Sequence, residues 1–591
     1  MKRPANIIWL LVVLIFASIA AVSCGGDGTS EQEPTEPPAA TPTAAPAAAA
    51  TSVPTAAPAA TPVPAAVGAV QKRLRVLAAV DRENNDPVLG LVHQTPQYHG
   101  TVFETLFDDD ENFKMRNMLA TDWSVTPDGK TWTFQLREGV PFHDGWGEFS
   151  AKDLFHTMQR YTREDSVNAT LYNMHNMVDH VEIIDDYNVV MDLPDPFLDA
   201  LAQFSGLQVS DIVSKDYFDA EGQEGVNRKM IGTGPYQFVE RVLGSHVLHE
   251  RVDYDHWRIK PDFEEIQIFI VLEPSTQLAN LLAGEADLGR LPFDLQGPAI
   301  DGGLKIIEST IPSTTVYAIF GGNYSLGELA HEELQEDPSL FNPDFPWAIP
   351  GENGRKVREA LNRAVNREEL KNTVLGGRGQ VMPVTFYLPF LNGWNPEWLE
   401  TFEDDYGYDP VRAQELLAEV EADRGAPLDW TNARYWLSPR PELAEVQDVG
   451  EAVANYWQAI GVPIQIEERE LAYAAEQFFA RKISGIAWTD ATPFRETDRE
   501  QLRIIYASAG CCEFYSDDVV NQNYQTFLAS VDLAERDQIL RDTGNHLYEQ
   551  YATVPLVALN VEFVINPDVI AEYKTSGFRP PRLLEYIKAV K

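Results

Sequence analysis

Basic residues are scarce in this chain of 591 residues. It contains 46 lysines and arginines against 90 aspartates and glutamates, which gives a formal net charge of −44 at pH 7. Nucleic acids are bound by basic surfaces, so this balance excludes a nucleic acid as partner. It also argues against adhesion to anionic lipid, because the two surfaces would repel each other. Any association with a membrane therefore needs an anchor.

Cysteine is nearly absent as well. The three cysteines are Cys24, Cys511 and Cys512. The last two are adjacent, and a disulfide between neighbours would close a strained eight-membered ring. Two reduced thiols and a bond between the neighbours both stay open, since an extracytoplasmic site permits disulfides. The pair supplies too few ligands for a structural metal site, and we expect no metal.

Catalytic motifs are missing too. The chain has no G-x-S-x-G nucleophile elbow and no glycine-rich phosphate loop. His331 opens a segment that begins like a zinc-protease helix, but Gln335 stands where the second histidine is required. A membrane-anchored hydrolase with degenerate motifs stays an alternative, and the missing nucleophile–base pair argues against it. We expect neither an enzyme nor a cofactor.

The amino terminus carries a targeting signal. Two basic residues precede an apolar run from Ile7 to Val22, and small residues lead up to Cys24. This is the layout of a secretory signal peptide. The cysteine makes it resemble a bacterial lipoprotein signal, which implies a signal peptide over 1–23 and acylation of Cys24. The run is about 16 residues long, short of the ~20 that span a bilayer, so an uncleaved anchor is the weaker alternative.

A low-complexity segment, 24–70, follows the signal. From 25 to 68 it contains no Lys or Arg and is rich in Pro, Ala and Thr. Such a composition cannot bury enough apolar surface to offset the entropy of ordering, so we expect a disordered linker. Its prolines favour extended conformers, which suits a stalk that holds a domain away from a membrane.

The remaining residues, about 71–591, are enough for two or three domains. Apolar periodicity predicts strands over 74–79, 131–136 and 266–270, a hairpin over 181–192, and helices over 151–161, 274–283, 356–365, 412–422, 443–460 and 532–550. Ser150, with an acid three residues later, is the expected N-cap and capping box of the first helix. Helices interleaved with strands predict layered α/β structure.

Long motifs run through this part of the chain. They include PDGKTWTF at 127–134, LREGVPFHDG at 136–145, GTGPY at 232–236, STQLANLLAGEAD at 275–287 and VREALNRAVNRE at 357–368. These motifs resemble, in the same order, those of family 5 extracellular solute-binding proteins, the peptide, nickel and oligosaccharide receptors of ABC importers. The GTGPY segment is expected to be structural. An acidic stretch with prolines, 326–353, departs from the family, and we expect it to be a surface insertion.

The resemblance implies an α/β fold of the periplasmic-binding-protein type (type II, cluster C), with two lobes joined by hinge strands. The implied lobes are 71–320 with 555–591, and 321–554. Apolar strand candidates at 314–320 and 554–559 mark the crossings. A ligand would be buried between the lobes as the hinge closes. The closed monomer would deliver it to membrane permease subunits, and a sensory receptor that does not import stays open.

The resemblance also implies ligand-binding residues. Peptide receptors of the family hold the α-amine of an extended peptide with a carboxylate, and the corresponding segment implies Asp490 for the amine and Trp488 for a wall of the cleft. Tyr435 and Trp436, at the end of a predicted strand, could face the same cleft.

Alternatives to this site stay open. Asp490 could instead cap the turn before Pro493. Thr492 stands where the family has an aspartate, which puts peptide specificity in doubt. Flat aromatic walls would also suit sugar rings, so an oligosaccharide is the alternative to a peptide ligand.

Overall fold

The computed structural model describes residues 72–591 apart from several gaps. The gaps are 82–84, 90–95, 164–180, 194–195, 197, 200, 202–203, 206–210, 441–442, 494–497, 504, 509, 511–512, 576 and 578–580. The chain divides into two compact units, Met1–Val70 and Gln71–Lys591. The predicted signal peptide, Cys24, the linker, Cys511 and Cys512 lie outside the described residues. A search of the described residues finds no helix with the length and apolar character needed to cross a membrane.

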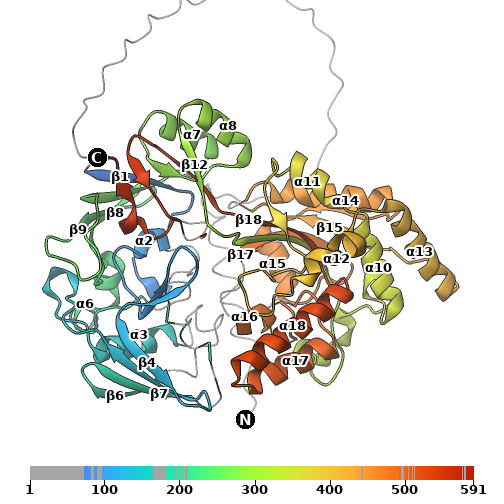
Figure 1. Ribbon diagram of the computed structural model, residues 1–591, viewed down its shortest axis with the longest axis horizontal. Coiled ribbons are helices and arrows are strands. Elements are labelled where there is room, and N and C mark those ends of the chain that lie inside the picture. Colours follow the sequence, from blue (N-terminus) through green and yellow to red (C-terminus); the bar gives the residue numbers. More distant parts are fainter. Residues whose placement is uncertain are drawn as a thin grey trace, which may run out of the picture. The chain divides into compact units, whose positions relative to one another are not determined.

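Three larger sheets organise residues 71–591 (Figure 1). The first has seven strands in the order β12-β19-β11-β1-β10-β9-β8. Their bounds are β1 (Arg73–Ala78), β8 (Tyr236–Val242), β9 (His246–Arg251), β10 (Glu265–Ile270), β11 (Leu288–Gly289), β12 (Lys305–Glu308) and β19 (Glu562–Ile565). Strand β1 runs parallel to β10 and β11. Helices α7 (Pro274–Leu282) and α8 (Phe293–Asp301) pack together beside β11 and β12. The predicted strands 74–79 and 266–270 are confirmed within one residue.

The second sheet has four antiparallel strands in the order β4-β5-β7-β6. Their bounds are β4 (Ala120–Val125), β5 (Thr131–Leu136), β6 (Val181–Asp185) and β7 (Asn188–Asp192), and helices α3 (Ala151–Tyr161) and α6 (Lys215–Arg228) accompany them. The predicted strand 131–136, the hairpin and the helix 151–161 are confirmed. Ser150 and Asp153 form the predicted capping box, and the Ser150 N–H donates to the Asp153 carboxylate at 3.0 Å.

Short elements complete this half of the fold. They are α2 (Pro96–His99) and two two-stranded sheets, which pair β2 (Phe107–Asp109) with β3 (Met115–Asn117) and β20 (Ile570–Glu572) with β21 (Lys588–Ala589).

The third sheet has six strands in the order β14-β18-β13-β17-β15-β16. Their bounds are β13 (Thr314–Phe320), β14 (Gln380–Val381), β15 (Arg434–Leu437), β16 (Gln465–Glu468), β17 (Ile486–Pro493) and β18 (Val554–Leu559). The accompanying helices are α9 (Glu332–Glu336), α10 (Glu352–Arg363), α11 (Arg367–Thr373), α12 (Glu397–Tyr406), α13 (Pro410–Arg424), α14 (Val446–Ala459), α15 (Leu471–Phe479), α16 (Asp498–Arg503), α17 (Asp518–Ala529) and α18 (Leu533–Glu549). The helices predicted over 356–365, 412–422, 443–460 and 532–550 are confirmed as α10, α13, α14 and α18, with ends that differ by a few residues.

The chain passes twice between the seven-stranded and the six-stranded sheet. One passage lies between β12 and β13, and the other between β18 and β19. The passages are hydrogen-bonded to each other, since Ser309 N donates to Val561 O at 2.9 Å and Asn560 Nδ2 donates to Ser309 O at 2.7 Å. The two apolar segments predicted at the crossings, 314–320 and 554–559, are therefore neighbouring buried strands that begin or end beside them.

A second set of contacts joins the side of the four-stranded sheet to helices near the carboxyl terminus. Asp199 forms an ion pair with Arg536 of α18 at 3.1 Å. At the turn between β4 and β5, a Cβ on Gly129 would lie 3.3 Å from the side chain of Val531, which precedes α18. The rings of Phe113 and Phe390 stack with centroids 6.5 Å apart. Contacts therefore bridge these parts in addition to the two passages.

Residues 326–353 are only partly a surface insertion, and that prediction is wrong for their second half. Trp347 is fully buried and packs against Phe320 and Trp457, and its indole N–H donates to Gly321 O at 3.0 Å. Phe345 is also buried. Acidic residues dominate the composition of the stretch and favoured a surface position. Its second half is nevertheless buried, because large aromatic side chains such as Phe345 and Trp347 pack in the core.

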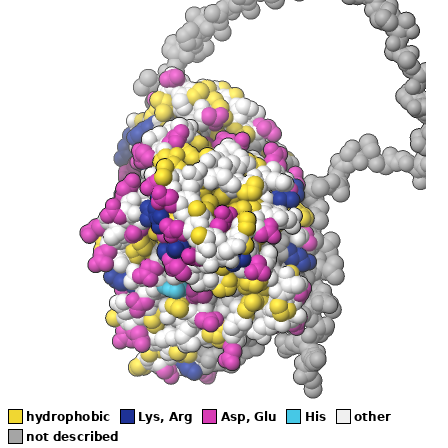
Figure 2. Space-filling model, turned by 90° about the vertical axis from the view of Figure 1, so that its right-hand side faces the viewer, with side chains coloured by type: hydrophobic (Ala, Val, Ile, Leu, Met, Phe, Trp, Pro, Cys, Tyr) yellow, Lys and Arg dark blue, Asp and Glu magenta, His cyan; other side chains and the backbone are white. Residues whose placement is uncertain are grey.

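Acidic side chains are spread over the face shown in Figure 2, and smaller basic groups lie between them. This distribution agrees with the strong excess of acidic over basic residues in the sequence.

Candidate functional site

Three neighbouring strands bring the predicted ligand residues together. Strand β17 pairs in parallel with β15 and antiparallel with β13. The register sets Trp436 opposite Trp488, and Asp490 opposite Tyr317. Side chains alternate between the two faces along a strand, so Trp436, Trp488 and Asp490 share one face of the sheet.

Tyr435 lies on the other face. Its side chain is fully buried, its ring meets that of Trp457 with centroids 5.4 Å apart, and its hydroxyl is hydrogen-bonded to Thr489. The expectation that Tyr435 and Trp436 face the same cleft is wrong, because consecutive strand residues point in opposite directions. Tyr435 is a core residue.

Trp436 and Trp488 form an aromatic floor on their face of the sheet. Each is 4% exposed. Helix α15 supplies their neighbours, with Phe478 against Trp488 and Tyr473 against Trp436, each at 5.8 Å between centroids. Neither indole N–H has a hydrogen-bond partner within the described residues. An unsatisfied buried donor costs about 1–3 kcal/mol, so an acceptor that reached these groups would be stabilised.

An ion pair lies beside this floor. Arg440 Nη2 is 2.6 Å from Asp490 Oδ1, and the two side chains are 19% and 12% exposed. The guanidinium carbon of Arg440 is 5.5 Å from the centroid of the Trp488 ring. Asp490 also accepts a hydrogen bond from the N–H of Ala491 at 2.7 Å. Asp490 lies inside β17, which continues through Pro493, so the described strand gives the turn-capping alternative no support.

Arg440 is the residue that the sequence reasoning missed. It stands between Pro439 and Pro441, three residues after the end of β15. Prolines restrict the backbone on both sides of it. Ligands of α/β sheets bind outside the carboxyl ends of parallel strands, which is the position that Arg440 occupies. An arginine held between prolines directly after a predicted strand is the signal that could have found it.

A second guanidinium lies at the same edge of the sheet. Arg469 follows β16, and its guanidinium carbon is 6.0 Å from the centroid of the Trp436 ring. Its Nη2 donates to Glu467 at 2.6 Å, and Glu467 also pairs with Arg434 at 3.0 Å. Ser438 lies between Trp436 and Arg440 in the sequence. Its hydroxyl is buried and has no hydrogen-bond partner in the described residues.

The GTGPY motif lies at a different place, beside the buried carboxylate of Glu104. It accepts hydrogen bonds from Thr233 at 2.9 Å, Trp257 at 3.2 Å and Arg258 at 3.0 Å. Burial alone would raise the pKa of the Glu104 carboxyl, but its hydrogen bond with His256 and the charge of Arg258 outweigh burial and leave that pKa below its usual value. These residues therefore form a buried ionic cluster, which we call the Glu104 cluster.

Two glycines of the GTGPY motif allow the chain to pack tightly next to this cluster. A Cβ at Gly232 would lie 2.1 Å from Val102 O, and one at Gly234 would lie 2.4 Å from Thr101 O. The His143 ring is hydrogen-bonded to Gly234 O at 2.8 Å, and burial lowers the pKa of this histidine to about 4. These contacts agree with a structural role for the motif.

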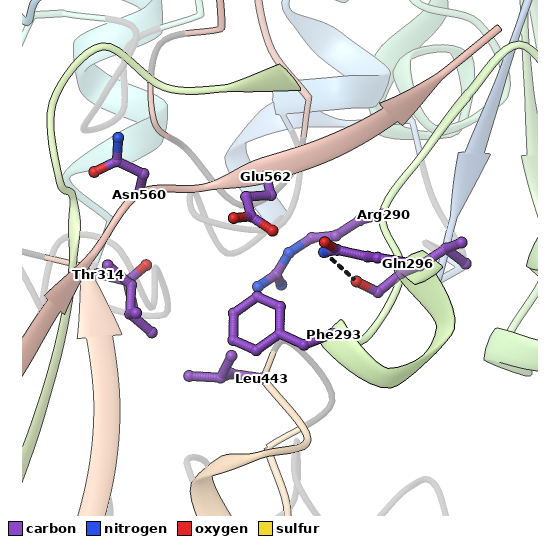
Figure 3. Close-up of a pocket in the computed structure, with 9 residues that line it drawn as sticks. Arg290, Phe293, Gln296, Thr314, Leu443, Asn560 and Glu562 are labelled. Atoms are coloured by element: carbon purple, nitrogen blue, oxygen red, sulfur yellow. Dashed lines mark hydrogen bonds between the residues drawn. The ribbon is translucent and has the colours of Figure 1, made fainter. Parts of the chain in front are cut away.

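Two cavities in the described part of the chain are small. One, of about 10 Å³, lies beside the passages between the sheets (Figure 3) and is lined by Arg290, Leu291, Phe293, Gln296, Thr314, Leu443, Leu559, Asn560 and Glu562. The other, of about 40 Å³, lies at the Glu104 cluster, and Arg258, Asp108 and Glu585 are among its lining residues. The first has room for at most one water molecule and the second for a few. Neither could hold a peptide.

Contacts around the smaller cavity join the two sheets. Arg378 pairs with Glu562 at 2.8 Å and donates to Gln296 at 2.7 Å, and Phe293 N donates to Glu445 at 2.7 Å. In Figure 3, Phe293 and Leu443 approach each other from the two sides. These contacts hold the elements of the two sheets together beside the passages.

Among the described residues, no group of His, Cys, Asp and Glu side chains could hold a metal ion.

Comparison with known proteins places this geometry in a class. The chain has 20% identity and a TM-score of 0.65 to the periplasmic binding protein DppA from Helicobacter pylori in complex with the peptide STSA, covering 86% of this chain and 97% of that one. The fold is thus the two-lobed α/β fold of periplasmic binding proteins, as the motifs implied.

The family follows from sequence. Residues 114–497 match the model of bacterial extracellular solute-binding proteins, family 5, and the chain belongs to that family. It is 26% identical over 501 residues to the glutathione-binding protein GsiB of Pectobacterium atrosepticum, across 80% of this chain and 88% of that protein. It is 27% identical over 371 residues to a dipeptide-binding protein of Escherichia coli strain K12, across 59% and 62%. At the level of the family these are solute-binding proteins and not enzymes.

Proposed function

We propose that this protein is the lipid-anchored substrate-binding component of an ABC importer, and that it captures short peptides for delivery to membrane permease subunits. The observation that carries the choice of a peptide is the ion pair of Arg440 and Asp490 at the carboxyl edge of the parallel strands. A free peptide carries an ammonium group, which matches Asp490, and a carboxylate, which matches the planar guanidinium of Arg440. Binding would replace one ion pair by two.

The surroundings of the pair favour a charged ligand over a sugar. Stacking on a sugar needs an open aromatic face, whereas Trp436 and Trp488 are 4% exposed and each has a guanidinium near its ring. Buried polar groups without partners accept a ligand only where that ligand completes their hydrogen bonds. The indole N–H groups and the Ser438 hydroxyl can donate to the carbonyl and carboxylate oxygens of a peptide. The names of the relatives that bind glutathione and dipeptides support the same choice.

The remaining parts of the proposal come from the family and the amino terminus. The two lobes would be 71–320 with 555–591, and 321–554, and they would close on the ligand as a monomer. Cys24 would carry the lipid, and 24–70 would be the linker. Hinge closure explains how polar groups of the ligand can be sequestered from water, because closure around a ligand is a common way for two-lobed binding proteins to switch.

Calorimetry on the processed protein in detergent tests the ligand. We expect di- and tripeptides to bind, and N-acetylated peptides to bind poorly because they lack the ammonium group. Asp490→Ala should weaken peptide binding at least tenfold, because it leaves the ammonium unpaired at a cost of about 2–5 kcal/mol. An exposed control, Asp301→Ala on α8, should bind peptides as the wild type does. Tight binding of oligosaccharides, indifferent to Asp490 and without any peptide heat, would overturn the choice of a peptide.

Fractionation of cells tests the anchor. We expect the wild type in the membrane fraction and Cys24→Ser in the soluble extracytoplasmic fraction or as an unprocessed precursor, because stable anchoring needs acyl chains. Ser23→Ala, which leaves the thiol in place, is the matched control and should stay on the membrane. Membrane retention of a normally processed Cys24→Ser protein would contradict the lipid anchor.

A further inference from the structure

Two arginine–tryptophan pairs stand side by side at the carboxyl edge of the six-stranded sheet. The register sets Trp436 opposite Trp488 on neighbouring parallel strands, and Arg440 lies near one ring and Arg469 near the other. Arg469 is held in line with the sheet, since its backbone N–H donates to Leu437 O at 2.9 Å. The proposed function uses Arg440 and both indole N–H groups, and it gives Arg469 no role.

The second pair has an excess of positive charge. Arg440 faces its own carboxylate, Asp490. Arg469 shares one carboxylate, Glu467, with a further guanidinium, that of Arg434. Its neighbour Glu468 points to the opposite face of the strand by the alternation of side chains. Two guanidinium groups around one carboxylate favour an additional anion.

The same place also has free donor capacity and an accessible wall. The indole N–H of Trp436 and the hydroxyl of Ser438 are buried and lack partners within the described residues. Tyr473, which contacts Trp436 at 5.8 Å between centroids, is 46% exposed, and the Arg469 side chain is 38% exposed. A ligand group that entered here would lie against the exposed Tyr473 ring, within reach of the Arg469 guanidinium and the Trp436 indole N–H.

We infer that Arg469, with Trp436 and Tyr473, forms a second subsite that takes an acidic side chain of the bound peptide. This inference rests on the proposed function and narrows it to short peptides with an additional carboxylate. The α-amine would pair with Asp490 and the main-chain carboxylate with Arg440. The side-chain carboxylate would pair with Arg469, while its methylene groups would cover the exposed ring of Tyr473. Arg469 is then a specificity-determining residue.

Calorimetry with three dipeptides, Ala-Ala, Ala-Gln and Ala-Glu, tests the subsite on the processed protein. Ala-Gln has nearly the size of Ala-Glu and lacks its charge. We expect Ala-Glu to bind at least tenfold more tightly than Ala-Gln. In Arg469→Gln this preference should vanish while the affinity for Ala-Gln stays within about threefold, because the neutral peptide does not use the charge.

Two further variants keep the test decisive. Arg469→Lys retains the charge without the planar fork, and we expect it to keep part of the preference. The control Arg412→Gln, which removes an arginine on α13 that pairs with glutamates away from the site, should keep the whole preference. Equal binding of Ala-Glu and Ala-Gln by the wild type, or a preference that survives in a folded Arg469→Gln protein, would overturn the subsite alone. Failure of all three peptides to bind would overturn the proposed function, and the subsite with it.

Discussion

Two buried ionic groups in this protein differ in how complete they are. In the Glu104 cluster, the carboxylate accepts three hydrogen bonds, from the side chains of Thr233, Trp257 and Arg258. At the edge of the six-stranded sheet, Asp490 has one guanidinium partner, and the indole N–H groups and the Ser438 hydroxyl beside it have no partner in the described residues. A carboxylate whose hydrogen bonds are completed within the protein, as those of Glu104 are, serves the fold because its charge is already compensated. A group whose hydrogen bonds are incomplete can still gain energy from a ligand.

The residues of the family motifs and the candidate ligand-binding residues lie in different places. The GTGPY motif of the family supplies Thr233 to the Glu104 cluster. Arg440 lies in a segment that none of these motifs contains. The motifs therefore identify the fold well and the ligand poorly, which is a general property of folds that serve many functions.

The largest expected effect breaks the Glu104 cluster. Glu104→Gln should lower the free energy of unfolding by about 3–5 kcal/mol, because it removes one partner of a buried ionic group and leaves Arg258 undercompensated. Urea unfolding followed by circular dichroism measures this change. Glu397→Gln, at an exposed position on α12, is the matched control and should shift the midpoint little. Peptide affinity of folded Glu104→Gln should match the wild type, and a selective loss of binding would show that this cluster contacts the ligand.

The next effect removes both charges of the incomplete site. The double variant Arg440→Met with Asp490→Asn should lose at least tenfold in peptide affinity, since each terminal charge of the ligand loses a partner worth about 2–5 kcal/mol. Its stability should stay close to that of the wild type, because removing both members of an ion pair leaves no uncompensated charge. Calorimetry and thermal unfolding of the same sample give both values.

A matched double variant controls for the loss of an ion pair as such. Arg363→Met with Glu359→Gln, on α10, removes a pair of 2.8 Å and should leave peptide affinity unchanged. If the Arg440–Asp490 double variant were less stable and its folded fraction retained peptide affinity, the pair would serve the fold and would not bind the ligand.

A smaller effect depends on pH and concerns the contact between Asp199 and Arg536. Burial raises the pKa of the Asp199 carboxyl from 3.8 to about 6, although Arg536 opposes the shift. Asp498, on α16 nearby, also has a pKa raised by burial. Because the pKa in the folded protein lies above the ordinary value, the ionised carboxylate is disfavoured there. The loss of folding stability that comes from ionising Asp199 is absent below about pH 4 and is complete once the pH exceeds the pKa in the folded protein.

We therefore expect the melting temperature of the wild type, relative to that of Asp199→Asn, to fall as the pH rises from 5 to 7.5. Asp219→Asn is the control, because hydrogen bonding to Lys215 lowers the pKa of Asp219 below 3.8 and moves its titration outside this range. Calorimetric scans at four pH values measure the difference. A difference that does not change with pH would contradict a titration of Asp199 in this range.

The smallest expected effect compares the two faces of β15. Tyr435→Phe should cost about 1–3 kcal/mol of stability, because the buried Thr489 hydroxyl loses its partner, and it should leave peptide affinity unchanged. Trp436→Phe, on the other face, should weaken the binding of peptides. Chemical unfolding and calorimetry of both variants test this assignment, and weaker peptide binding by Tyr435→Phe would return Tyr435 to the site.

Most secondary structure could be predicted because its signals are local. Ser150 and the acid three residues later define the start of α3, and alternating apolar residues define β5. Local signals were weaker guides to burial. In 326–353, charge suggested a surface position, yet Trp347 lies in the core against Trp457, which is more than a hundred residues away in the sequence.

The candidate site shows the same division. The resemblance to the family implies Asp490 and Trp488, and the end of a predicted strand adds Trp436. The structure places all three on one face of neighbouring strands. Their role in binding stays a prediction. Arg440 was not named, because its partner lies 50 positions along the chain and only the parallel pairing of β15 with β17 brings the two together. Tyr435 was assigned to the wrong face, because the face of a strand residue depends on which side the core covers.

The sequence by itself determined the acidic balance, most of the elements and the family, since each of these depends on composition or on residues close together in the chain. Only the tertiary structure decided which face of β15 meets the core, which arginine pairs with Asp490, and that a residue of the GTGPY motif contacts Glu104. These facts depend on strand register and on contacts between distant segments, and a one-residue change of register would turn every side chain of a strand to the opposite face.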